Sequence, residues 1–224
     1  MQASTSRCGA SGHPEFVLEC DEAIAFMLPF LLEWLEGSVA AGTVFRPGQT
    51  MQMGWSALRV EPGENGTLTL SEPDLSGIPD QRLQGVSLTL LALYRQKGAV
   101  DSFDPALPPA FPSMSQGAIC CDAYPEAEAL LLSRIPGDAQ DSGWFFGCTR
   151  EGHDHQSTEQ LRKGSLYELA CRRPAVIEFL AMPAGSYILL DAQENLVSVF
   201  AQDGRPLKPT PGSYLDRERD AKAE

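Results

Sequence analysis

Residues 138–155 read DAQDSGWFFGCTREGHDH, a stretch that joins a turn, an aromatic segment and a polar loop. The triplet D-S-G (141–143) predicts a tight turn, because Asp and Ser side chains bond nearby backbone N–H groups and Gly permits a positive φ. The residues W-F-F-G-C (144–148) predict a strand. The polar residues T-R-E-G-H-D-H (149–155) predict a loop. The centre of the chain is therefore expected to be built from strands and turns.

Alternation along this strand leaves two interpretations of its aromatic residues. Trp144 and Phe146 fall on one face and Phe145 on the other. In the first interpretation the turn leads into a core strand. In the second, Trp144 or Phe145 is presented outward beside acidic residues, since large aromatic residues are frequent anchors of protein interfaces.

The residues that follow and precede this stretch alternate between short strands and short helices. Strands are expected at 117–123, 129–135, 186–191 and 195–200, and short helices at 166–171 and 175–181. The first half of the chain has the same mixture. It predicts a helix over 20–40 with a kink or a junction at Pro29, a hairpin from strands at 50–60 and 67–70, and a second helix over 83–97.

This pattern predicts an α+β fold of two small lobes, each a mostly antiparallel sheet packed with helices. A segment with four prolines separates the lobes and is expected to be a connector. The predicted division is a disordered amino terminus, an amino-terminal α+β lobe, a proline-rich connector, a second domain that contains D-S-G-W, and a charged tail, at residues 1–14, 15–104, 105–116, 117–207 and 208–224.

The charge of the chain narrows its possible partners. The 224 residues carry a formal net charge of −13. Nucleic acids and anionic membranes both require a positive surface, so neither is expected as a partner. Acidic residues concentrate at 15–36 and 122–159, which favours either simple solubility or a surface complementary to a basic protein. We find no uncharged apolar run of about 18 residues and no secretory signal, and so expect a cytoplasmic protein.

The six cysteines have no C-x-x-C pair and no regular spacing. The adjacent Cys120 and Cys121 would point to opposite faces of a strand, which disfavours a disulfide framework. We therefore expect free thiols that are partly buried. No G-x-S-x-G motif and no strand–glycine-rich loop–helix unit occurs, so the sequence predicts neither that type of hydrolase nor a nucleotide-binding enzyme.

The H-D-H triplet is the best candidate for a metal site. His153 and His155 would project to one side of an extended chain, and Cys148 offers a third ligand for zinc. The alternative is an exposed polar loop without a metal, and that alternative is preferred, with no cofactor expected.

Several segments resemble a family of bacterial immunity domains marked by a D-S-G-W motif, the immunity family numbered thirty-three. In the second half these are D-S-G-W-F-F-G-C, the following H-D-H, S-L-Y-E-L-A-C (165–171) and F-L-A-M-P-A-G-S (179–186). In the first half L-P-F-L-L-E-W-L-E-G, R-P-G-Q-T-M-Q-M-G-W-S-A-L-R-V and L-S-E-P-D-L-S-G-I-P resemble the amino-terminal part of longer members. The resemblance spans roughly residues 15–205.

The resemblance implies a protein that binds and neutralises a cognate secreted antibacterial toxin, such as an effector of type VI secretion, and it transfers no catalytic residues. The acidity suits a basic nuclease, and a DNase in particular. The predicted toxin-binding residues are Asp138, Asp141, Trp144, Phe145, Glu151, His153, Asp154 and His155. Two alternatives remain, a metal-dependent hydrolase or metal-regulated binder on Cys148, His153 and His155, and a module that senses a small ligand between the lobes.

Overall fold

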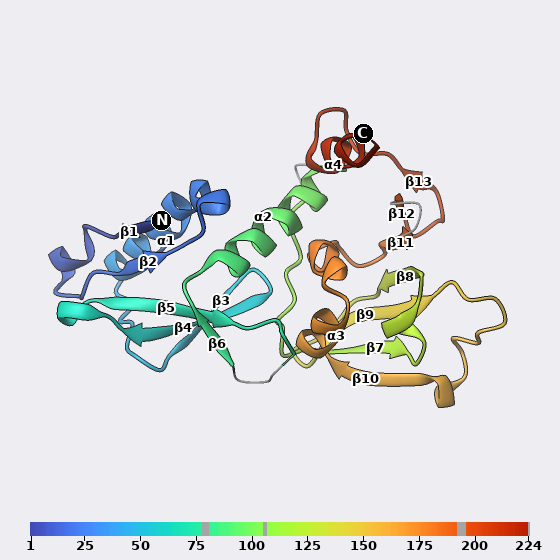
Figure 1. Ribbon diagram of the computed structural model, residues 1–224, viewed down its shortest axis with the longest axis horizontal. Coiled ribbons are helices and arrows are strands. Elements are labelled where there is room, and N and C mark those ends of the chain that lie inside the picture. The colour runs from blue at the N-terminus through green and yellow to red at the C-terminus, as the bar shows by residue number, and fades with distance from the viewer. Residues whose placement is uncertain (78–80, 105–106, 192–195, 224) are drawn as a thin grey trace. The chain divides into compact units, whose positions relative to one another are not determined.

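The computed structural model describes residues 1–77, 81–104, 107–191 and 196–223 (Figure 1). They form two compact units, Met1–Tyr94 and Arg95–Glu224. The division falls within helix α2 (Ser87–Asp101), ahead of the predicted connector. Residues 105 and 106 of that connector, and Asn195 of the predicted strand 195–200, lie outside the described residues. The predicted α+β class is confirmed, because helices accompany mostly antiparallel sheets.

A four-stranded antiparallel sheet with the order β3-β4-β5-β6 is the larger sheet of the first unit. Its strands are β3 (Thr50–Met53), β4 (Ser56–Pro62), β5 (Leu68–Pro73) and β6 (Arg82–Gln84), with the 3-10 helix η3 (Glu64–Gly66) between β4 and β5. The predicted hairpin is thus present as β4 and β5. The predicted strand 50–60 is two strands, because Gly54 adopts a φ of 60° and turns the chain back.

The amino terminus is ordered, so the prediction of a disordered segment over 1–14 is wrong. Two strands pair there, β1 (Gln2–Ser4) and β2 (Val17–Glu19), with the 3-10 helix η1 (Cys8–Ser11) between them. The hydroxyl of Thr5 donates to Glu15 at 2.5 Å and accepts from the N–H of Phe16 at 2.8 Å. These bonds satisfy the polar groups internally, which the composition of the segment does not reveal.

The predicted helix over 20–40 consists of two abutting helices, the 3-10 helix η2 (Glu22–Met27) and α1 (Leu28–Ala40). Pro29 lies in the first turn of α1, where its missing N–H is not needed. One face enters the core through Ile24, Leu28, Leu31, Leu35 and Val39. By length and composition Glu22–Ala40 is also apolar enough to cross a membrane, a test that core helices of globular units pass as well.

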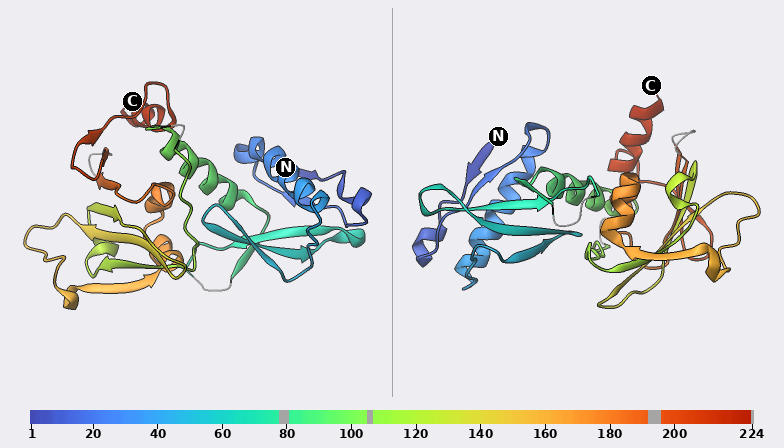
Figure 2. Two further views of the ribbon diagram at one scale, coloured as in Figure 1. Left: turned by 180° about the vertical axis from the view of Figure 1, so that it is seen from behind. Right: turned by 60° about the horizontal axis from the view of Figure 1, so that its bottom comes forward.

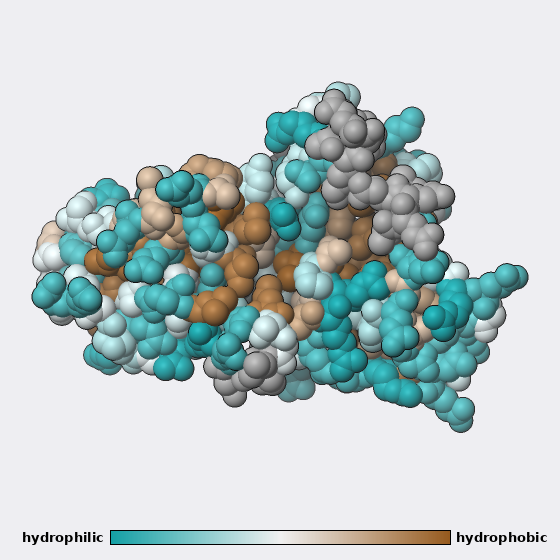
Figure 3. All heavy atoms as spheres, in the orientation of Figure 1, coloured by the Kyte–Doolittle hydropathy of each residue, from teal (hydrophilic) through white to brown (hydrophobic). Residues whose placement is uncertain are grey.

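The opposite face of these two helices exposes large aromatic side chains. Phe26, Phe30 and Trp34 follow one another at intervals of four residues and are 60%, 49% and 38% exposed. Figure 3 shows hydrophobic surface on the first unit among more hydrophilic residues. The prediction of a helix over 20–40 did not identify this exposed aromatic stripe.

Helix α2 begins four residues later than predicted. Gly85 adopts a φ of 105°, which separates β6 from the helix. The buried carboxylate of Glu72 accepts hydrogen bonds from the N–H groups of Leu88 and Thr89 at 3.0 and 2.7 Å and so caps the first turn. Burial raises the pKa of Glu72 despite these bonds.

The second unit is built on a seven-stranded sheet with the order β10-β7-β9-β8-β11-β12-β13. Figure 2 shows the ribbon from two further sides. The strands are β7 (Gly117–Cys121), β8 (Ala129–Arg134), β9 (Asp141–Cys148), β10 (Leu161–Ser165), β11 (Tyr187–Asp191), β12 (Leu196–Phe200) and β13 (Pro206–Leu207). All neighbours are antiparallel except β7 and β9. The sequence predicted β7, β8, β9, β11 and β12, and missed β10 and β13.

Helices and the segment after them pack on this sheet. The helical elements are η4 (Tyr124–Glu126), η5 (Thr158–Gln160), α3 (Leu166–Arg172), η6 (Pro174–Phe179) and α4 (Tyr214–Ala223). The Tyr124 hydroxyl donates to the carbonyl of Leu169 in α3 at 3.0 Å, and Phe146 and Phe179 are fully buried. The helix predicted at 166–171 is confirmed as α3, whereas 175–181 forms a 3-10 helix.

Candidate functional site

The D-S-G triplet, predicted as a turn ahead of the strand, forms the first three residues of β9 and turns locally within it, where the register with β7 shifts between Gly117 and Ile119. The Asp141 carboxylate accepts the N–H of Gly143 at 2.9 Å, and the Ser142 hydroxyl donates to the carbonyl of Gly117 in β7 at 2.8 Å. Gly143 has a φ of 75°, and a Cβ placed there would lie 2.0 Å from the carbonyl oxygen of Ile135. The predicted positive φ is present, and any side chain at this position would clash with backbone.

Trp144 lies in the core and is 1% exposed. Its indole N–H donates to the carbonyl of Leu180 at 3.1 Å, and its ring stacks on Phe146 with centroids 5.8 Å apart. The prediction that Trp144 is an outward anchor is therefore wrong, because its face of β9 is the one covered by the helices. Phe145, on the other face, is half-buried.

Arg134 links the D-S-G-W turn to the segment after η6. Its guanidinium donates to the carbonyls of Ala110 and Met182 at 2.6 Å, Leu180 at 3.1 Å and Ser142 at 3.2 Å. Its Cζ lies 5.5 Å from the centroid of the Trp144 ring. Burial lowers the pKa of Arg134 to about 10. No local pattern of residues indicates this role of Arg134, since the four acceptors are backbone groups far apart in the chain.

A second cluster gathers at the opposite end of β9. Cys148 ends β9 and Cys121 ends β7. Because these two strands are parallel neighbours, their carboxyl ends meet at the same edge of the sheet. The loop after β9 returns His153 and His155 to this edge. One ligand atom from each of the four side chains lies within 4.8 Å of the others.

The contacts within this cluster are close and largely hidden from solvent. The Cys148 sulfur is 3.8 Å from Nε2 of His155, and the two histidine rings have centroids 5.0 Å apart. Both cysteines are buried, and the His153 side chain is 9% exposed. The His155 ring also rests edge-on against Phe145, with centroids 5.4 Å apart.

The chemistry of the cluster is that of a ligand set rather than of a nucleophile. Burial, followed by the neighbouring Cys148, raises the pKa of Cys121 to about 11, so the free thiol stays protonated at neutral pH. Burial, followed by His153, lowers the pKa of His155, which favours the neutral imidazole that metals bind. Four protein ligands would fill a tetrahedral shell and leave no position for a catalytic water, so the metal-dependent hydrolase gains no support.

Cys121 is the member of the cluster that the sequence analysis missed as a ligand. The adjacent cysteines were noted, and the H-x-H pair was matched with Cys148. The sequence does not show that β7 and β9 pair in parallel, and this pairing brings Cys121 and Cys148 together although they are 27 positions apart. Neither local spacing nor a recognised motif encodes that pairing.

The remaining predicted binding residues are mostly on the surface. Asp138, Glu151 and Asp154 are exposed. Asp141 is partly exposed, and its carboxylate lies 3.7 Å from the Lys163 ammonium. Glu151 and Asp154 share the loop that carries His153 and His155, whereas Asp138 precedes the other end of β9.

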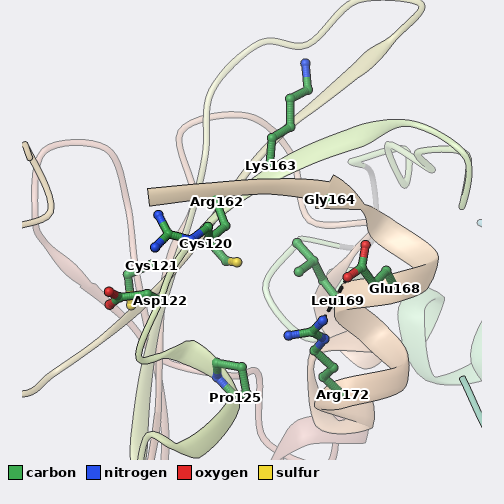
Figure 4. Close-up of a pocket in the computed structure, with 10 residues that line it drawn as sticks. All are labelled: Cys120, Cys121, Asp122, Pro125, Arg162, Lys163, Gly164, Glu168, Leu169 and Arg172. Carbon is green, nitrogen blue, oxygen red and sulfur yellow. Dashed lines mark hydrogen bonds and ion pairs between the residues drawn. The ribbon is translucent and has the colours of Figure 1, made fainter. Parts of the chain in front are cut away.

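A surface hollow of about 350 Å³ lies beside the cluster, between β7, β10 and α3. Its lining residues, shown in Figure 4, are Cys120, Cys121, Asp122, Pro125, Arg162, Lys163, Gly164, Glu168, Leu169 and Arg172. Arg172 and Glu168 form an ion pair of 2.9 Å, while Lys163 points away from the hollow. Burial raises the pKa of the Cys120 thiol, so this hollow offers no activated nucleophile.

The comparison with family models gives a match within the second unit. Residues 95–201 match the family model of the Imm33-like domain. This match supports assignment of the second unit to a family of immunity proteins. The comparison with curated proteins gave no significant match, and neither did the comparison with solved structures.

The Imm33-like match begins at Arg95, which is also the first residue of the second compact unit. It contains the Arg134–Trp144 contact and all four residues of the cysteine–histidine cluster. The resemblance expected over residues 15–205 is thus supported for the second unit, and residues 15–94 lie outside the match.

Proposed function

We propose that this protein is an immunity protein that binds and neutralises a cognate toxin in the cytoplasm, and that the toxin is a basic nuclease such as a DNase. The Imm33-like match over residues 95–201 carries the immunity role. The polar side chains of the D-S-G-W turn are engaged in hydrogen bonds within the fold, so we assign them a structural role. We propose no catalytic step for this chain.

The nuclease class is inferred from charge. Nucleases grip a phosphate backbone with basic side chains, and the protein has a net charge of −13. Both units contribute to this negative charge. Residues 1–94 hold eleven acidic and four basic residues, and residues 95–224 hold nineteen acidic and thirteen basic residues. An acidic surface speeds the encounter with a basic protein and selects against acidic ones.

We propose that the exposed carboxylates Asp138, Glu151 and Asp154 contact the toxin and occupy its substrate groove. Trp144 has no part in this surface. The exposed stripe of Phe26, Phe30 and Trp34 on the first unit is a second candidate for contact, because aromatic side chains anchor many interfaces.

Calorimetry of the purified protein with the product of the adjacent toxin gene tests the immunity role. We expect nanomolar binding that weakens as salt is raised. No interaction at micromolar concentration would contradict it. A tightly bound partner that attacks peptidoglycan or lipid would leave the immunity role intact and refute the nuclease class.

Charge-neutralising variants test the proposed surface. The triple variant Asp138→Asn, Glu151→Gln, Asp154→Asn keeps the oxygen acceptors of the two Asp side chains and removes three charges. We expect a loss of affinity of at least about tenfold, mainly through slower association. The triple control Glu19→Gln, Glu64→Gln, Asp203→Asn makes the same charge change at other exposed positions. Equal losses of affinity from the two triple variants would contradict the proposed surface and show only a general effect of net charge. The variant Phe30→Ala would then test whether the aromatic stripe contacts the toxin.

A further inference from the structure

We propose that Cys121, Cys148, His153 and His155 bind one Zn²⁺ ion at the carboxyl ends of β7 and β9. Two ligands come from parallel neighbouring strands and two from the loop that follows β9. The site would fasten this loop to the edge of the sheet. It does not depend on the proposed toxin.

The separations fit a tetrahedral site after a small contraction. Zinc bond lengths of about 2.0–2.3 Å place the ligand atoms of a tetrahedron roughly 3.3–3.8 Å apart. The four candidate atoms already lie within 4.8 Å of one another, and Cys148 Sγ and His155 Nε2 are 3.8 Å apart. A shift of about 1 Å in the longest separation therefore completes the geometry.

One nitrogen of the cluster has no hydrogen-bond partner among the described residues, and a bound metal ion would supply it with one. Nε2 of His153 is buried and has no hydrogen-bond partner within the described part of the chain. The carboxylate of Asp122 is 3.6 Å away, beyond hydrogen-bond distance. A buried polar nitrogen without a partner is costly, and a bound cation relieves that cost.

Local packing holds the ligands near these positions. The His155 ring rests edge-on against Phe145, with ring centroids 5.4 Å apart. Gly147 allows the His155 ring to approach, since a Cβ there would lie 3.0 Å from Cε1 of that ring. Such support of the ligands from their neighbours is characteristic of metal sites.

The donor set selects zinc. Two thiolates and two imidazoles in a tetrahedral arrangement are the donors of structural zinc sites, whereas Ca²⁺ and Mg²⁺ require oxygen ligands. The rival state is a disulfide between Cys121 and Cys148, which would consume two ligands and leave both histidines without a metal.

The full-length protein is purified with Zn²⁺ present, dialysed and analysed for metal and for free thiols. We expect one equivalent of zinc per chain and six thiols in the metal-free, denatured protein. Replacement by Co²⁺ should give the visible absorption of a tetrahedral thiolate site. Chelation should lower Tm by about 10 °C.

Cys148→Ser and His155→Gln should lose the zinc and the cobalt spectrum. Cys120→Ser is the matched control, because its buried thiol is adjacent to Cys121 but outside the cluster, and it should retain both. Less than a tenth of an equivalent of zinc, with no cobalt spectrum in the unmodified protein, would overturn the proposal. So would four thiols instead of six, or equal metal loss from Cys120→Ser. The cobalt spectrum of the unmodified protein stays decisive if a variant fails to fold.

Discussion

The two ends of β9 are built in opposite ways. At the amino-terminal end, Asp141, Ser142 and Trp144 all make hydrogen bonds within the fold, and the carbonyl of Ser142 accepts one from Arg134. At the carboxyl-terminal end, four metal-binding side chains converge and one buried imidazole nitrogen has no hydrogen-bond partner among the described residues. The polar side chains at the D-S-G-W end already have hydrogen-bond partners within the fold. The side chains at the C-T-R-E-G-H-D-H end could still bind a ligand.

This difference separates the residues that stabilise the fold from the residues that are available to bind a ligand. The D-S-G-W residues determine a backbone turn and a core contact, and these are requirements of folding. Capacity for a metal and exposed carboxylates both occur in the loop after the strand. The D-S-G-W residues, on which the family resemblance rested, thus serve the fold, and the Trp144 side chain is buried rather than presented to a partner.

The largest effect is expected from Gly143→Ala. The new Cβ would be 2.0 Å from the carbonyl oxygen of Ile135, at a φ of 75°. Backbone would have to move, so we expect a loss of more than about 4 kcal/mol in the free energy of unfolding, or no folded second unit. Chemical denaturation monitored by tryptophan fluorescence measures this loss.

Gly152→Ala is its matched control in the loop beyond the other end of β9. Gly152 has the same φ of 75°, but no atom lies within 4 Å of the Cβ that would be added. Only the intrinsic cost of a left-handed residue applies there, about 1–2 kcal/mol. Similar losses from the two variants would contradict the tight packing inferred at the D-S-G-W end.

Arg134→Met should have the next largest effect. It removes the donor that serves the carbonyls of Ala110, Ser142, Leu180 and Met182. We expect a loss of about 3 kcal/mol in the free energy of unfolding, because buried acceptors lose their partner. Arg205→Met, at an arginine whose side chain is 68% exposed, should change it by less than about 0.5 kcal/mol. If the two variants unfolded alike, Arg134 would not hold the turn to the segment after η6.

At the other end of β9, Gly147→Ala should weaken metal binding more than folding. The added methyl would lie 2.8 Å from the Phe145 ring and 3.0 Å from the His155 ring. Both are side chains that can move, so we expect a loss of about 1 kcal/mol in stability. The displaced His155 should lower cobalt affinity by about tenfold or more. Unchanged cobalt affinity would remove His155 from the proposed ligand set.

The sequence predicted the local features of both ends and missed the contacts that join distant segments. The positive φ of Gly143 and the strand from Trp144 to Cys148 follow from residue chemistry and alternation. Which aromatic residue is buried depends on which face of the sheet the helices cover. The place of Cys121 in the cluster depends on parallel pairing with β9, and alternation along one strand cannot show which strand lies next to it.

The same limit explains the errors in the first unit. Residues 1–14 are polar, yet Thr5, Glu15 and Phe16 satisfy one another across a turn. The stripe Phe26–Phe30–Trp34 has helical spacing like the core stripe beside it. Hydrophobic periodicity identifies the helix, while the position of the sheet decides which stripe is covered.

The smallest effect is expected from Asp138→Ala, just before β9. One carboxylate oxygen accepts the N–H groups of Gln140 and Asp141 at 2.7 and 2.8 Å, and these bonds hold the pKa of Asp138 below its usual value. A lowered pKa in the folded state gives a contribution that is present above the unfolded value and lost as pH falls through the folded one. The unmodified protein should therefore lose its advantage over Asp138→Ala below about pH 4. Thermal unfolding of both proteins from neutral to acidic pH measures the difference, and a constant gap across that range would show that the side chain acts on the turn without its charge. Asp138→Asn, which keeps an acceptor oxygen, should fall between them at neutral pH, because an uncharged acceptor forms the weaker hydrogen bond.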